Sequence, residues 1–63
     1  MNETFGLSDA VDMAVTAEHY SIIRQGDGPD FAGWLMDTYA GEDREYVAAL
    51  SLSTLHGRYL EAR

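Results

Sequence analysis

The segment Gly26-Asp27-Gly28-Pro29-Asp30 separates two helices and thereby decides the fold. Gly26 readily adopts the left-handed conformation that ends a helix, and Pro29 fits the first turn of the next helix, where its missing N–H is not needed. Asp30 is expected either to cap the helix or to place a carboxylate in its first turn, where the helix dipole favours negative charge. The sequence therefore predicts two helices joined by a short turn.

Toward the N-terminus, the first helix is predicted to begin at Ser8 and to end near Gln25. Ser8 is a favourable N-cap residue, and Asp9 adds an acid to the first turn. Residues 19–23 could instead form a β-strand, because they are rich in β-branched and aromatic side chains. A second strand candidate is evident only in the residues up to Leu7, so we favour the helix.

Toward the C-terminus, the second helix is predicted from Phe31 to Ala40, with a stop at Gly41. A third helix begins there and runs to about His56, or to the C-terminus if Gly57 does not stop it. Its apolar residues recur at steps of four and three, which form one stripe along a helix. This stripe consists of Ala48, Leu52, Leu55, Tyr59 and Ala62.

Residues 1–63 are thus expected to form a single all-α domain of three helices, with short connections that contain Gly or Pro. The 46% hydrophobic and 24% charged content is that of a folded chain. The chain has no cysteine, which excludes disulfides and thiolate metal sites. A core of this size leaves only about 3 to 5 kcal/mol of net stability, so oligomerisation would help.

The predicted first helix is apolar on two opposite sides. One side would face the core, and the other carries Val11, Val15 and Ile22. Three short helices cannot bury both sides. We therefore expect these three residues to contact a partner or a second copy of the chain.

Charge is the most unusual feature of the composition. The chain has eleven acidic residues and four basic residues, all of them arginine, which gives a formal net charge of -7. Direct binding to nucleic acid or to an anionic membrane is therefore disfavoured, because both require positive charge. A basic protein or nucleoprotein complex is the favoured partner, although ordinary solubility accounts for the acidity equally well.

No pattern for catalysis, metal binding or cofactor binding is present. His19 and His56 lie far apart and outside any HExxH motif, so a structural role is favoured for both. The turn at residues 27–30 lacks the twelve-residue pattern of a calcium loop, and the GxGxxG and P-loop spacings are absent. We expect no catalytic residue, no metal, no cofactor and no enzyme activity.

The start of the chain lacks the basic residues of a secretory signal, and its apolar runs are far too short to cross a bilayer. Cytoplasmic localisation is the resulting expectation.

The stretch from Phe31 to Tyr46 contains Trp34 and the run Asp37-Thr38-Tyr39-Ala40-Gly41-Glu42. It resembles the acidic Tyr-x-Gly-Glu segments of antirestriction proteins that mimic DNA, over about a quarter of the chain. In size, acidity and lack of catalytic motifs, the chain is also similar to phage-encoded anti-CRISPR proteins, a class without a shared sequence signature. The net charge of -7 is milder than that of the strongest DNA mimics, so aromatic contacts would matter beside charge.

These resemblances imply a non-enzymatic inhibitor that occupies the surface of a basic, nucleic-acid-handling complex. The alternative is a small helical oligomerisation or regulatory module, antitoxin-like or a subunit of a larger assembly. Acids gathered on one face would favour the inhibitor, and a continuous exposed apolar face would favour the module. The residues predicted to contact the partner are Asp27, Asp30, Trp34, Asp37, Tyr39, Glu42, Asp43 and Glu45.

Overall fold

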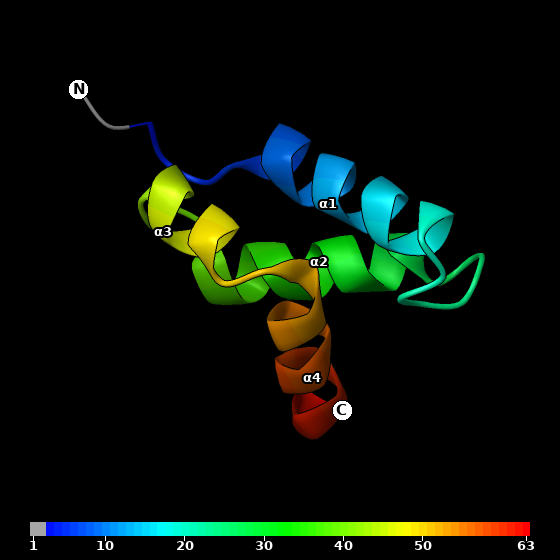
Figure 1. The fold of residues 1–63 in the computed structure, drawn as a ribbon. Helices are drawn as coiled ribbons and strands as arrows, with labels where there is room; N and C mark the ends of the chain where they lie inside the picture. The colour runs from blue at the N-terminus through cyan, green and yellow to red at the C-terminus, as the bar shows by residue number, and fades with distance from the viewer. Residues whose placement is uncertain (1–2) are drawn as a thin grey trace.

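A computed structural model describes residues 3–63, which contain four helices (Figure 1). They are α1 (Leu7–His19), α2 (Gly28–Tyr39), α3 (Arg44–Ala49) and α4 (Leu52–Ala62). The described part of the chain has no β-strand, only one isolated bridge. The predicted all-α fold is confirmed, and the third predicted helix is divided in two.

The α1 and α2 helices form an antiparallel pair at the centre of the fold (Figure 1). Three buried alanines on α1 let the two helix axes approach closely, because small side chains leave room for the opposing helix. The buried residues of the pair are Ala10, Ala14 and Ala17 on α1 and Gly28, Phe31, Ala32, Leu35 and Tyr39 on α2.

The α1 helix ends at His19, six residues before the predicted end at Gln25, and no strand forms at residues 19–23. Ser21 adopts a left-handed conformation with φ of 60°. Its N–H donates to the Glu18 carbonyl at 3.1 Å, and the Ile22 N–H donates to the Ala17 carbonyl at 2.8 Å. This pair of bonds is a Schellman motif, which usually has glycine in the place of Ser21.

The helical conformation is interrupted at Ser51, between α3 and α4 and inside the predicted third helix. Ser51 has φ 67° and ψ 153°, and its Oγ accepts a hydrogen bond from the Thr54 N–H at 3.3 Å. The new helix therefore starts in a new direction, and α4 points away from the α1–α2 pair (Figure 1). It then continues past Gly57 to Ala62.

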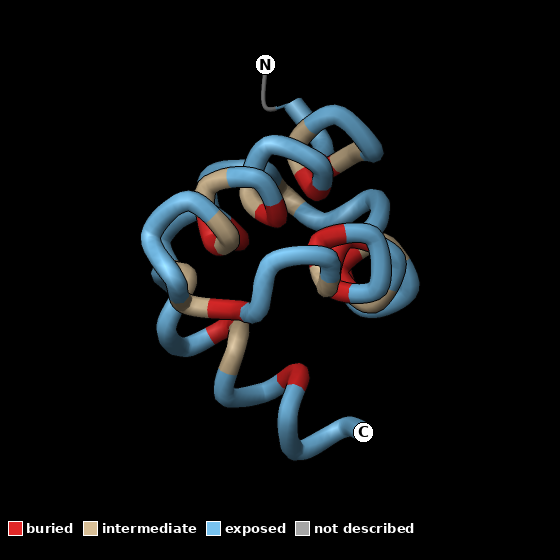
Figure 2. The backbone as a smooth tube through the Cα atoms, turned by 90° about the vertical axis from the view of Figure 1, so that its right-hand side faces the viewer, coloured by how far each residue is buried: buried red, intermediate tan, exposed pale blue. Residues whose placement is uncertain are grey.

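The break divides the predicted apolar stripe. Leu55 and Tyr59 are buried and Leu52 is half-buried, whereas Ala48 and Ala62 are exposed. The stripe extends along α4 only, because α3 and α4 do not share an axis. Figure 2 shows buried positions turned toward the interior and an exposed C-terminal end.

An aromatic cluster joins α2 to α4. The Phe31 and Tyr59 rings meet edge to face with centroids 5.3 Å apart, and the Trp34 and Tyr59 centroids are 5.6 Å apart. Such pairs add to the burial of apolar area. The Arg58 guanidinium also donates a hydrogen bond to the Tyr39 hydroxyl at 3.0 Å, which raises the pKa of Arg58 above its usual value.

The N-terminal segment lies antiparallel to the turn between α2 and α3. The Phe5 N–H donates to the Glu42 carbonyl at 2.7 Å, and the Gly41 N–H donates to the Phe5 carbonyl at 3.1 Å. The Phe5 ring is buried and meets Tyr39 edge to face, with centroids 6.5 Å apart. Sequence patterns did not place Phe5 in the core.

Ser51 offers a test of backbone strain. Because its φ and ψ lie in a region suited to glycine, Ser51→Gly is expected to raise the free energy of unfolding by about 1 kcal/mol; glycine costs only a few tenths of a kcal/mol as an N-cap. Ser51→Ala is expected to lower it by about 1 kcal/mol, since the cap is lost and the strain remains. Thermal unfolding followed by circular dichroism should show shifts of about 5 °C in opposite directions. Equal shifts in the same direction would contradict the strained conformation.

Candidate protein-binding surface

Four of the eleven carboxylates are engaged within the fold. Arg44 forms ion pairs with Glu3 and with Asp9, the latter with 3.0 Å between Nε and Oδ1. Asp43 caps α3, because its Oδ1 accepts a hydrogen bond from the Glu45 N–H at 3.0 Å. These contacts tie the N-terminal segment, α1 and α3 together.

Glu18 is the fourth engaged acid, and it shapes the start of α2. Its Oε2 accepts hydrogen bonds from the Gly26 N–H at 2.5 Å and from the Gly28 N–H at 3.1 Å. A Cβ atom at Gly28 would lie 2.9 Å from Glu18 Oε1, so only glycine fits without a shift of the carboxylate. Sequence analysis did not distinguish Glu18 from the other acids. The glycines eight and ten residues later were the available signal for a carboxylate that accepts from two N–H groups.

The other seven carboxylates make no side-chain hydrogen bond or ion pair with any residue in the range 3–63. They lie on α1, at both ends of α2, in the following turn, on α3 and at the end of α4: Asp12, Asp27, Asp30, Asp37, Glu42, Glu45 and Glu61. These groups carry most of the negative charge that faces solvent.

Charge is segregated between the helices. Neither α1 nor α2 contains a lysine or an arginine, although together they hold five acids. The four arginines lie in the loop after α1, on α3, and on and after α4. Asp30 and Asp37 are seven residues apart, which is nearly two full turns, so they lie on the same side of α2 at a rise of roughly 10 Å. The α1–α2 pair is therefore uniformly acidic.

The eight predicted partner-binding residues do not form one cluster. Asp27 and Asp30 lie at the start of α2, while Asp37, Glu42 and Glu45 lie near its end and in the turn and helix that follow. We call the exposed residues Asp37, Glu42 and Glu45 the acidic edge.

The remaining predicted residues are less accessible. Tyr39 is buried and Trp34 is half-buried, and their rings meet edge to face with centroids 5.8 Å apart. Asp43 is half-buried and caps α3. These three residues stabilise the fold in this structure, and contact with a partner stays a prediction for them.

An apolar groove of ≈ 330 Å³ runs between α1 and the start of α2. Leu7, Val11 and Val15 lie along one side of α1 at steps of four, with exposed fractions of 65%, 45% and 59%. Ile22, predicted to share this face, lies in the turn after α1 and packs half-buried against the core instead. The groove is lined by Val11, Ala14, Val15, Glu18, Gly28, Pro29 and Ala32.

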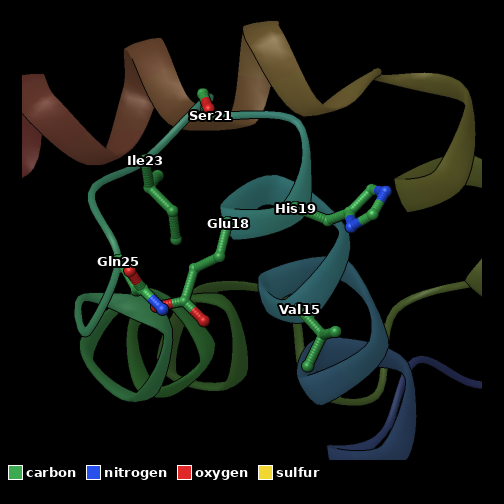
Figure 3. A pocket seen from close by; sticks show the side chains of 6 residues that line it. All are labelled: Val15, Glu18, His19, Ser21, Ile23 and Gln25. Carbon is green, nitrogen blue, oxygen red and sulfur yellow. The ribbon is translucent and has the colours of Figure 1, made fainter.

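A second depression of ≈ 440 Å³ lies at the other side of Glu18 (Figure 3). Figure 3 shows the Glu18 carboxylate beside Gln25 and the His19 ring directed away from both. The carboxylate already accepts two backbone hydrogen bonds, so this depression does not pair a free base with a nucleophile. Among the described residues, no group of three His, Asp or Glu side chains could hold a metal ion.

No helix in the described range 3–63 combines the length and the apolar character that a membrane span requires. No protein-family model matches the chain, and neither a curated protein nor a solved structure matches it.

Proposed function

We propose that this chain is a non-enzymatic cytoplasmic inhibitor that occupies the surface of a basic, nucleic-acid-handling complex, in the manner of anti-CRISPR or antirestriction proteins. The observation that supports this most is the uniform charge of the α1–α2 pair together with the unpaired acidic edge. Unpaired carboxylates speed the encounter with a positively charged surface, because the attraction acts over several ångströms before contact.

The charge density supports occupation of the partner's surface more than full imitation of a duplex. Double-stranded DNA carries about one charge per 1.7 Å of axis. The two outward carboxylates on α2 are spread over roughly 10 Å. Since an exposed ion pair contributes at most about 1 kcal/mol, apolar contacts must supply the rest of the affinity.

Reversal of the acidic edge tests this function. Asp37→Lys combined with Glu42→Lys should weaken binding to the captured partner on the order of tenfold, because two attractive contacts become repulsive. Asp43 is left unchanged because it caps α3. The measurement is affinity capture from lysate at low and high salt, with mass spectrometry to identify the retained proteins and titration of the purified partner to measure affinity.

A matched control gives the same change in net charge on α4. Ser53→Lys, Leu60→Lys and Glu61→Lys alter three exposed residues away from the acidic edge and should leave affinity unchanged. The proposal is supported if the wild type and the control retain a salt-sensitive nucleic-acid-binding protein and the Asp37→Lys, Glu42→Lys variant does not. Equal loss of affinity in both variants would reduce the effect to net charge and would refute a specific acidic edge.

The second candidate is a small oligomerisation or regulatory module, and the exposed stripe of Leu7, Val11 and Val15 favours it. Capture of only the protein itself, as a salt-insensitive oligomer in sedimentation, would support this function over inhibition.

A further inference from the structure

One side of the α1–α2 pair packs against another helix, and the other side is exposed to solvent in the described chain. On one side, Phe31 and Trp34 of α2 pack against Tyr59 of α4. On the other side lies the apolar groove, with Val11 and Val15 exposed on its rim. Among residues 3–63, no helix covers Val11 and Val15, since both side chains are exposed.

The groove and the exposed stripe that continues it along α1 together have the length of a helix-binding site. Leu7, beyond the groove, and Val15, on its lining, are eight residues apart on one side of α1, which corresponds to roughly 12 Å or two turns of a bound helix. Its floor is formed by small residues, Ala14 and Ala32, which allow a second helix to approach closely. An amphipathic helix places apolar anchors into such a groove at steps of three and four.

The charged side chains of α1 and α2 are all acidic, and Arg24 lies in the loop that joins the two helices. Asp12 lies on α1 one step beyond Val11, and Asp30 and Asp37 lie along the outward side of α2. All three carboxylates are exposed, and none pairs with a base in the described chain. Lysine or arginine on either flank of a bound helix would meet a carboxylate.

This charge argues against a second copy of the chain as the occupant. Two copies joined through this face would bring two acidic α1–α2 pairs together without a single lysine or arginine from α1 or α2. Like charges placed opposite each other at an interface are costly. A small molecule is also a poor match, since Glu18, the polar side chain of the groove, already accepts two backbone hydrogen bonds.

We propose that the apolar groove between α1 and α2 binds an amphipathic helix of the partner, with apolar anchors in the groove and lysine or arginine on its flanks. This inference rests on the proposed function and names the element of the basic partner that the chain recognises. The apolar contacts hold the helix, and the exposed carboxylates of α1 and α2 select its charge.

The test uses two synthetic peptides of about 18 residues, long enough to form a helix. Both carry leucine at steps of three and four; one has lysine and arginine on the flanks and the other has glutamate. Fluorescence anisotropy at low salt should show binding of the basic peptide at least tenfold tighter than that of the acidic peptide. Methyl NMR signals of Val11 and Val15 should shift, and those of Leu60 should not.

Val11→Gln combined with Val15→Gln leaves the net charge unchanged and should weaken binding of the basic peptide at least tenfold. Leu60→Gln removes an equally exposed apolar side chain from α4 and should have no effect. Unchanged binding by the groove variant would overturn the inference. So would a wild-type dimer that the groove variant abolishes, because a second copy would then be the occupant.

Failure of this inference and failure of the proposed function give different results. If the wild type captures a salt-sensitive nucleic-acid-binding protein but the groove variant retains it equally well, only the groove is assigned wrongly. If the basic peptide binds in the groove but no such protein is captured, the groove stands and the inhibitory function is wrong.

Discussion

Leu55→Asp is expected to leave the domain unfolded. Leu55 lies on α4, and its side chain is 0% exposed in the core. A carboxylate in this apolar site would have no partner, and a buried unpaired charge costs several kcal/mol. The whole domain has only about 3 to 5 kcal/mol of net stability to lose. Thermal unfolding followed by circular dichroism should show no cooperative transition.

The control for this substitution is Leu60→Asp in the same helix. Leu60 is 50% exposed, so the new carboxylate stays in water and the free energy of unfolding should change by no more than about 0.5 kcal/mol. Leu52→Asp should fall between the two, since Leu52 is half-buried. If the thermal unfolding of the Leu55→Asp variant were identical to that of the wild type, α4 would not be part of the core.

Phe5→Ala should lower the free energy of unfolding by about 3 to 5 kcal/mol, nearly the whole stability of the domain. Phe5 is 2% exposed, and its ring packs against Tyr39. Its removal would leave a cavity between the N-terminal segment and the end of α2. Urea denaturation should show the midpoint near zero denaturant, or a chain unfolded from the start.

Leu7→Ala is the matched control for Phe5→Ala, because Leu7 lies two residues away but is 65% exposed. It should cost about 0.5 kcal/mol or less. Similar losses in both variants would mean that the N-terminal segment does not pack as the structure shows.

Of the candidate site, sequence reasoning identified the exposed acids but not their grouping. Asp30, Asp37, Glu42 and Glu45 are exposed as a binding surface requires. Tyr39 looked equally suitable, yet it is buried in the core. Residue type alone does not separate these cases, because tyrosine is common both in cores and at interfaces.

The apolar groove was only partly foreseen. The excess of apolar residues on the first helix predicted that Val11 and Val15 would need a partner, and both are exposed. Pro29 and Ala32 complete the groove from α2. Their approach to α1 depends on helix packing, which periodicity within one helix does not describe.

The sequence by itself determined the helical class and the turn before α2, because both follow from local chemistry; α2 nevertheless starts at Gly28, three residues before the predicted Phe31. Glycine and proline at residues 26–29 act through their own backbone preferences, and helical periodicity is a property of neighbouring residues. The acidity and the absence of thiol chemistry were equally determined by composition alone.

Only the tertiary structure decided where α1 ends, where the third predicted helix breaks, and that Phe5 joins the core. Ser21 and Ser51 adopt positive φ, which serine disfavours by itself, and burial of Ile23 after Ser21 and of Leu55 after Ser51 offsets that strain. Such burial depends on residues distant along the chain. The free energy of the whole fold therefore overrides local preference at these turns.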